Sequence, residues 1–367
     1  MKKLKHLKIK GFKSIESMDL ELRPLNILIG SNGAGKSNLI SFFKMLNEMM
    51  PGRLQQHIGI SGSAQSLLHF GPKITTQIEG ELTFEVENGL DTYIMRLAHA
   101  ANDILIFTEE TLKFLKTGYS SPKVDSLGVG HQETKINQSA DNGLETAKTL
   151  KYLLDRCRVY HFHDTSSTAG VRQSCYIGDD RWLMPDAANL AAMLLKFRQS
   201  DGGFAYHRII QAIQAIAPFF DDFVLEPNGY NRVILNWREK GSDRIFGPHQ
   251  FSDGTLRAIC LISLLLQPEE DLPKLIIVDE PELGLHPYAL NEIAAIFGKV
   301  SYSTQVLIST QSSSFVDNFE PEDIIAVNRK EKVSTFERLD SLKLETWLEE
   351  YSLGEIWEKN IVGGGPH

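Results

Sequence analysis

The sequence predicts an α/β fold in which a mixed, mostly parallel sheet is flanked by helices. An antiparallel β subdomain and an inserted, mainly helical lobe complete the expected architecture. Residues 25–29, apart from Asn26, and residues 275–278 are apolar runs, and each is followed by apolar residues at helical spacing, which is typical of strands buried in a parallel sheet. Between residues 74 and 97 apolar and polar residues alternate, which indicates antiparallel strands.

Composition excludes several classes of protein. The 367 residues are 42% hydrophobic and 23% charged, as in globular proteins, and the net charge of −9 argues against a surface built for passive nucleic-acid binding. Cys157, Cys175 and Cys260 form no C-x-x-C pair, and no apolar run is long enough to span a bilayer. We therefore expect a cytoplasmic protein with no membrane partner.

The first residues of the chain carry its densest basic run. Six lysines lie within residues 2–13, in a segment where Leu7 and Ile9 alternate with them. This pattern favours a solvated edge strand over a nucleic-acid site, although DNA stays open as a partner.

A glycine-rich loop follows the apolar run at 25–29. Residues 30–37 read G-S-N-G-A-G-K-S and lead into a helical pattern, which is the context of a phosphate-binding P-loop. Glycines let backbone N–H groups converge on an anion, Lys36 can reach the outer phosphates, and the Ser37 hydroxyl can ligate Mg²⁺. The sequence therefore predicts that the chain binds a nucleoside triphosphate and Mg²⁺. The residues expected around the triphosphate are Gly30, Ser31, Asn32, Gly33, Ala34, Gly35, Lys36, Ser37 and Asn38.

The middle of the chain is less regular. We expect a loop at 51–71 and an irregular, mobile excursion at 118–143, because both are rich in polar residues and glycine. Helical spacing then marks 187–197 and 204–220. The expected divisions are 1–150 for the first part of an ATPase head, 151–250 for the inserted lobe, and 251–367 for the second part of the head.

A second apolar strand, at 275–278, ends in two acids. Asp279 and Glu280 come directly after it, at the carboxyl end of a strand where open α/β sheets bind ligands. Asp279 suits Mg²⁺, and Glu280 is free to polarise an attacking water.

The stretch from Phe251 to Thr255, then Asp279-Glu280 and then 282–287, resembles the signature loop, Walker B strand and D-loop of ABC-type ATPase heads in the RecF/SMC/OLD branch. Residues 9–15 are similar to the first strand of that branch. The closing residues 357–366 are similar to stand-alone bacterial predicted ATPases of this group, which lack a coiled coil and a Toprim nuclease domain.

This resemblance assigns roles residue by residue. Lys36, Asp279 and Glu280 match the Walker A lysine, the Walker B acid and the catalytic base, while Ser37 matches the Mg²⁺ ligand. Lys13 matches a basic position that approaches the nucleotide phosphates.

The signature residues imply a dimer. Ser252 and Gly254 match residues that contact the γ-phosphate bound to the opposite subunit, so the resemblance implies a homodimer that sandwiches ATP. A Ser-x-Gly stretch that opens a helix also offers a hydroxyl and free N–H groups to an anion.

Two positions depart from the family pattern. Asp253 stands where glycine is more familiar, and we expect its side chain to turn away and cap the following helix. Gln311 stands at the switch position, where histidine is usual, and because Gln keeps a hydrogen-bond donor but carries no charge we expect slow hydrolysis.

The roles of two further sets of residues stay open. His161 and His163 could share a metal, although a structural role is favoured because no third ligand is in place. Gln65, His69 and Gln77 all lie where the Q-loop residue of the family is expected.

The leading function is an ATPase switch in DNA repair, chromosome maintenance or defence against phage, acting with a separate effector such as a nuclease. The alternatives are the nucleotide-binding subunit of a transporter and an ATP-binding scaffold with negligible hydrolysis.

Overall fold

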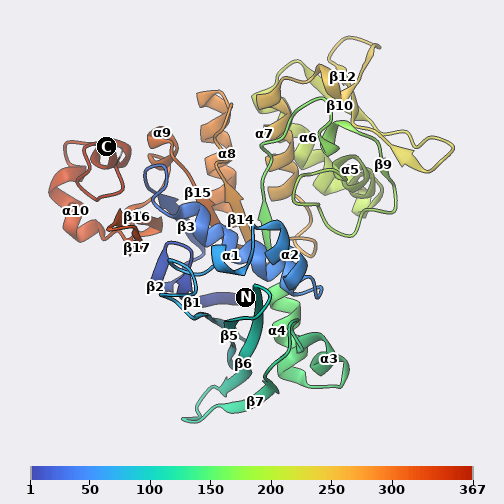
Figure 1. Ribbon diagram of the computed structural model, residues 1–367. Helices are drawn as coiled ribbons and strands as arrows, with labels where there is room; N and C mark the ends of the chain where they lie inside the picture. The colour runs from blue at the N-terminus through green and yellow to red at the C-terminus, as the bar shows by residue number, and fades with distance from the viewer. Residues whose placement is uncertain (1, 366–367) are drawn as a thin grey trace.

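Two six-stranded sheets form the frame of the molecule in the computed structural model, which describes residues 2–365 (Figure 1). The core sheet has the order β17-β16-β3-β15-β14-β8, and its neighbours are parallel except for β16 and β17. The α/β prediction is confirmed. Its strands are β3 (Leu25–Ile29), β8 (Cys157–Tyr160), β14 (Leu275–Asp279), β15 (Gln305–Ser309), β16 (Ile324–Lys330) and β17 (Val333–Arg338).

Both faces of the core sheet are buried, as continuous apolar strands predict. Ile27 and Ile29 of β3 join the hydrophobic cluster that continues into the lobe. Leu28, which points to the other face, joins the cluster formed with α1 and the antiparallel sheet. The core sheet therefore lies between two separate cores.

The second sheet is antiparallel, with the order β2-β1-β4-β5-β6-β7, and lies below the core sheet and α1 in Figure 1. Gln305 of β15, only 1% exposed, links the two sheets: its side chain donates to the Leu4 carbonyl at 2.8 Å and accepts from the Leu4 N–H at 3.0 Å. The strands are β1 (Lys3–Phe12), β2 (Ile15–Glu21), β4 (Gln77–Val86), β5 (Gly89–Ala100), β6 (Ile104–Lys116) and β7 (Lys123–Gly128).

The prediction of an edge strand for the basic run is wrong, because β1 lies between β2 and β4. Lysines of β1 instead form ion pairs with carboxylates on both neighbouring strands, β2 and β4. Lys8 lies 3.6 Å from Asp19 and 4.0 Å from Glu81, and Lys3 lies 3.5 Å from Glu85. Cross-strand pairing of opposite charges therefore accounts for the alternating lysines.

Eleven helices are described within residues 2–365, and two of them fall in segments expected to be loops. α2 occupies part of 51–71, and β7 and α3 occupy part of 118–143, so those expectations were wrong there. None of the described helices is long and apolar enough to cross a membrane. The helices are α1 (Lys36–Met49), α2 (Leu54–Ile60), α3 (Ile136–Asp141), α4 (Glu145–Asp155), α5 (Leu190–Gln199), α6 (Phe204–Ile216), α7 (Asp253–Leu265), α8 (Pro287–Val300), α9 (Ser313–Val316), α10 (Ser341–Leu348) and α11 (Leu353–Glu358).

The lobe holds α5, α6 and short strands, and Figure 1 shows it at the upper right beside α7. Residues 157–160, within the segment expected to form the lobe, are the β8 strand at the edge of the core sheet. We therefore propose that the inserted lobe begins after Tyr160. Its strands are β9 (Cys175–Tyr176), β10 (Phe220–Val224), β11 (Arg232–Val233), β12 (Asn236–Glu239) and β13 (Ile245–Phe246).

Candidate functional site

Three parallel strands of the core sheet end at one edge. In the register of the sheet Ser309 of β15 lies beside Leu28 of β3 and Asp279 of β14. The backbone ties the turns together, since the Thr310 N–H donates to the Leu28 carbonyl at 3.0 Å and the Glu280 N–H donates to the Ser309 carbonyl at 2.8 Å. The glycine loop, the two acids and the 309–311 segment therefore meet at the carboxyl edge of the sheet, where ligands bind in open α/β folds.

The glycine loop leaves the start of α1 open. No side chain caps this helix at Gly35, so its first N–H groups can receive an anion. Gly35 has φ 119°, and a Cβ there would lie 2.0 Å from the Ser334 hydroxyl, so only glycine fits. Ser37, on the first turn of α1, is exposed.

Two serines that the sequence reasoning missed hold the loop in place. Ser334 Oγ donates to the Ala34 carbonyl and is hydrogen-bonded to Ser14 Oγ, both at 2.6 Å. The Asn38 side chain donates to Ser14 at 2.5 Å, so Asn38 also helps to fix the loop. No local motif marks Ser14 or Ser334, because their contacts span about 300 residues of sequence.

Lys36 lies folded back on its own loop. Its ammonium group donates to the carbonyls of Gly30 and Ser31, and the residue is only 5% exposed. Burial lowers the pKa of Lys36, and the charges of Glu280, Asp279 and Glu282 act against this shift. The carboxylates at the end of β14 therefore lie within electrostatic reach of the glycine loop.

Lys13 lies in the turn between β1 and β2, with φ 50°, and its ammonium group donates to Ser41 Oγ on α1 at 2.6 Å. Burial, and then the charge of Lys44, lowers its pKa. Ser41 is one helical turn beyond Ser37, so Lys13 lies along α1 close to its open end.

The structure distinguishes the three Q-loop candidates by their surroundings. His69 is buried and its Nδ1 lies 2.6 Å from the Lys13 carbonyl. Gln77 donates to Glu79 at 2.9 Å, and Gln65 is exposed. His69 is therefore the candidate that contacts another predicted site residue.

Glu280 adopts a strained backbone conformation, with φ 45° in a non-glycine residue. Its carboxylate accepts a hydrogen bond from Gln311 Nε2, so the expected base and the switch residue are in direct contact. Strain of this kind persists where the surrounding structure imposes it, and it is common at functional sites.

Glu282 is a third acid at this edge that received no role from the sequence. One carboxylate oxygen accepts from Thr310 Oγ1 at 2.7 Å and from the Gln311 N–H at 2.9 Å. The other oxygen is buried without a partner among the described residues. Glu282 therefore orients the switch segment, and its position two residues after Glu280 is the sequence signal that could have identified it.

The signature residues form the start of α7. Ser252 is exposed and caps the helix by accepting from the Thr255 N–H at 3.1 Å. A Cβ on Gly254 would lie 2.2 Å from the Gly284 carbonyl, so glycine is needed where α7 meets the D-loop. Figure 1 places α7 beside the lobe, apart from the connection between β3 and α1.

The expectation that Asp253 caps α7 is wrong, because Ser252 occupies the cap position. Asp253 instead accepts from Arg172 Nη2 at 2.9 Å. Arg172 is only 5% exposed and also donates to the carbonyls of Thr165 and Pro248. This ion pair holds the Asp253 carboxylate at the side of the helix start.

Arg257 on α7 connects the signature to the acids. It donates to the Leu283 carbonyl at 3.1 Å and to the His163 carbonyl at 2.9 Å. His163 in turn donates through Nε2 to the Asp279 carbonyl at 3.0 Å. His163 thus has a structural contact, and no group of three or more His, Cys, Asp or Glu within residues 2–365 is placed to hold a metal ion.

A cavity of about 700 Å³ lies beside the glycine loop, between residues 31–34, Arg329 and the C-terminal segment 360–364. Arg329 Nη1 donates to the Gly33 carbonyl at 3.1 Å. In the closing segment 357–366, Trp357 Nε1 donates to the Gly364 carbonyl at 2.8 Å. Residue 366 of this segment lies outside the described residues.

Two family models match the chain in succession. Residues 1–171 match the model described as "AAA ATPase domain", and residues 178–317 match "AAA domain, putative AbiEii toxin, Type IV TA system". Each match covers less than half of the 367 residues, and both models describe AAA-type domains, so the chain is similar to such domains along most of its length.

The chain is also similar to individual proteins. It is 22% identical to "Old nuclease" of Escherichia phage P2 over 94% of the chain, and it spans 62% of the length of that relative. Two solved structures share its fold at 14% sequence identity. They are the SmcHead bound to the C-winged helix domain of ScpA (TM-score 0.63, 94% of this chain and 99% of that one) and an Smc head with an extended coiled coil bound to the C-terminal domain of ScpA derived from Pyrococcus furiosus (TM-score 0.62, 95% and 99%).

Glu282 gives the head a pH-dependent stability that can be measured. Burial raises the pKa of Glu282, outweighing the hydrogen bonds from Gln311 and Thr310. Its stabilising contribution is therefore complete below the usual pKa of glutamate, about 4.3, and is lost as the pH rises through the raised value. In Glu282→Gln the side chain cannot ionise, so we expect urea unfolding to show the variant gaining stability relative to the wild type as the pH rises above about 4.3.

Glu345→Gln, at an exposed position on α10, is the matched control and should follow the wild type at every pH. Parallel stability curves for Glu282→Gln and the wild type would contradict this account.

Proposed function

We propose that this head binds ATP with Mg²⁺, dimerises around the nucleotide and hydrolyses it slowly to reset a molecular switch. One observation carries the proposal: Lys36, Asp279 and Glu280 gather at one edge of the core sheet, while Ser252 is exposed at the start of a different helix. Because Ser252 lies apart from the glycine loop of its own chain, we infer that it contacts the phosphates bound to a second copy.

The residues at the sheet edge fit a nucleotide triphosphate and its metal. The uncapped N–H groups at the start of α1 and the ammonium of Lys36 would hold the phosphates, after Lys36 releases its own loop carbonyls. Ser37 Oγ and Asp279 would hold Mg²⁺, which neutralises phosphate charge when bound. The remaining nucleotide contacts proposed are Lys13, Gly30, Ser31, Asn32, Gly33, Ala34, Gly35 and Asn38.

Glu280 is proposed as the base that takes a proton from the attacking water. Gln311 contacts its carboxylate, and this supports Gln311 as the residue that orients Glu280 and offers a hydrogen bond to the γ-phosphate. Gln311 brings no positive charge to the transition state, so we propose slow turnover.

A Glu280→Gln variant should trap the dimer. Removing the base stops hydrolysis while leaving the phosphate contacts in place, so we expect the variant to elute as a dimer on gel filtration with ATP and Mg²⁺ and as a monomer without ATP.

Ser252→Ala in the same background should abolish that dimer by removing the trans contact. Because Ser252 also caps α7, Ser352→Ala is the matched control: it removes the cap of α11, at a similar cost of about 1 kcal/mol, and should leave the dimer intact. A Glu280→Gln protein that stays monomeric at saturating ATP would contradict the sandwich.

We further propose that the switch acts in DNA-related work in the cytoplasm, in repair, chromosome maintenance or defence against phage. The likeness to "Old nuclease" supports a link to nucleic acid and to a nuclease, and we propose that this effector is a separate protein. Purification of the head alone from its native cells, with no co-eluting protein, would contradict a stable effector complex.

An ATPase assay on the wild type and on Glu280→Gln, each with and without duplex DNA, tests catalysis and partner together. We expect slow hydrolysis by the wild type, a decrease of about 10²–10⁴-fold in Glu280→Gln, and a rate for the wild type that changes when DNA is added. Negligible rates for both proteins would identify an ATP-binding scaffold, equal measurable rates would contradict Glu280 as the base, and a wild-type rate unaffected by DNA would count against the DNA-related role.

A further inference from the structure

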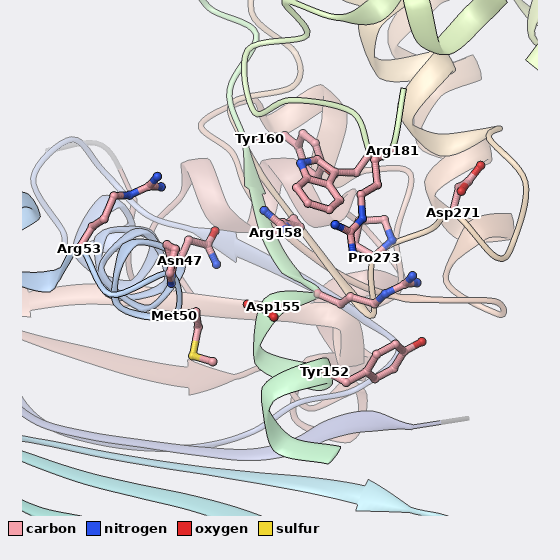
Figure 2. Close-up of a pocket in the computed structure, with 13 residues that line it drawn as sticks. Asn47, Met50, Arg53, Tyr152, Asp155, Arg158, Tyr160, Arg181, Asp271 and Pro273 are labelled. Carbon is pink, nitrogen blue, oxygen red and sulfur yellow. The ribbon is translucent and has the colours of Figure 1, made fainter. Parts of the chain in front are cut away.

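A second cavity lies at the β8 edge of the core sheet, at the opposite end of α1 from the glycine loop. Its volume is about 520 Å³. Residues from the end of α1, the end of α4, β8 and the 181–182 loop line it, and none of them belongs to the glycine loop. Figure 2 shows Arg158 and Arg181 on one side of this cavity and Arg53 reaching from the other.

We call this cavity the arginine pocket, after its four lining arginines, Arg53, Arg156, Arg158 and Arg181. Two of them are already occupied. Arg53 pairs with Glu48 at 2.8 Å, and Arg156 donates to the carbonyls of Glu270 and Leu272 at 3.1 and 3.3 Å.

Arg158 and Arg181 are held differently. Both guanidinium groups lie over the ring of Trp182, at 4.9 and 4.7 Å from its centroid, so two positive charges are close together on one aromatic side chain. Within residues 2–365 neither forms an ion pair with a carboxylate. An aromatic ring attracts a cation through its face and leaves the N–H edge of the guanidinium free.

Neither acid of the pocket forms an ion pair with these two arginines within residues 2–365. The Asp271 carboxylate is engaged by Lys196 at 3.0 Å. Asp155 lies within electrostatic reach of Arg158 and Arg181, but within residues 2–365 it forms no ion pair with either. In a chain with a net charge of −9, two neighbouring arginines without a carboxylate partner favour an anionic ligand.

Aromatic rings and a further guanidinium group lie near Arg158 and Arg181 in this pocket. Trp182 and Tyr152 are 40% and 42% exposed, and Arg156 lies 4.9 Å from the centre of the Tyr152 ring. Aromatic rings and guanidinium planes are the surfaces on which proteins stack nucleobases, and the free guanidinium edges match the geometry of a phosphate.

We propose that the arginine pocket binds a nucleotide unit, with its phosphate on Arg158 and Arg181 and its base stacked beside Trp182 or Tyr152. The unit can come from a free nucleotide or from a single strand of nucleic acid. This site goes beyond the ATP-driven switch and does not depend on it, because it uses none of the residues proposed to bind or hydrolyse ATP.

Fluorescence anisotropy with a short fluorescein-labelled oligothymidylate tests the proposal. The full chain carries Lys36→Ala so that the glycine loop does not contribute to binding. We expect Arg158→Ala/Arg181→Ala to weaken binding at least about tenfold and to reduce the slope of log K against log salt by about 0.7 for each phosphate that the variant no longer neutralises.

Arg244→Ala is the matched control, because Arg244 is exposed and also lies 4.9 Å from the centre of an aromatic ring, that of Phe246, but outside the pocket. It should bind as tightly as its parent. Arg158→Lys/Arg181→Lys keeps both charges and should retain most of the salt dependence while losing affinity, which separates a ligand contact from a loss of folding.

Competition with unlabelled thymidine monophosphate separates the two sources. Displacement by the mononucleotide supports a free nucleotide, and displacement only by unlabelled oligothymidylate supports a nucleic-acid strand. Equal affinities of Arg158→Ala/Arg181→Ala and Arg244→Ala would overturn the proposal, whatever the outcome of the ATPase and dimer experiments.

Discussion

The parallel register of β3, β15 and β14 is the constraint on which the rest of the head depends. It brings Leu28, Ser309 and Asp279 level with one another, so the three turns that follow must emerge at one edge of the sheet. Burial of both sheet faces fixes this register, because a shift by one residue would turn every apolar side chain toward the wrong core. The meeting of these three turns at one edge of the sheet is thus a consequence of packing.

Side-chain hydrogen bonds to backbone carbonyls extend this order from the acids to the signature. Arg257 holds α7 to the D-loop carbonyl of Leu283, and His163 completes a path from α7 to the Asp279 carbonyl. Gly254 allows α7 and Gly284 to approach closely. A chain of hydrogen bonds therefore connects the signature surface, which we propose contacts a partner's nucleotide, with the Asp279 carbonyl.

Local patterns in the sequence were enough to predict the buried strands, the glycine loop and the pair of acids at the end of β14. They did not predict the contacts made over long separations, such as Ser334 with Ala34 or Arg172 with Asp253, because these depend on how distant turns dock. The lysines of β1 were misassigned to an edge strand because their carboxylate partners lie on two other strands. The arginine pocket was missed for the same reason, since its residues come from four separate segments.

The central claim is that Ser252 of one copy closes over the glycine loop of another. Disulfide cross-linking measures this directly, because Asn32 and Ser252 are both exposed and the native cysteines are free and buried. A mixture of Asn32→Cys and Ser252→Cys proteins, each carrying Glu280→Gln, should form a covalent dimer when ATP and Mg²⁺ are added and little without them. Cross-linking that is absent, or that does not depend on ATP, would contradict the account.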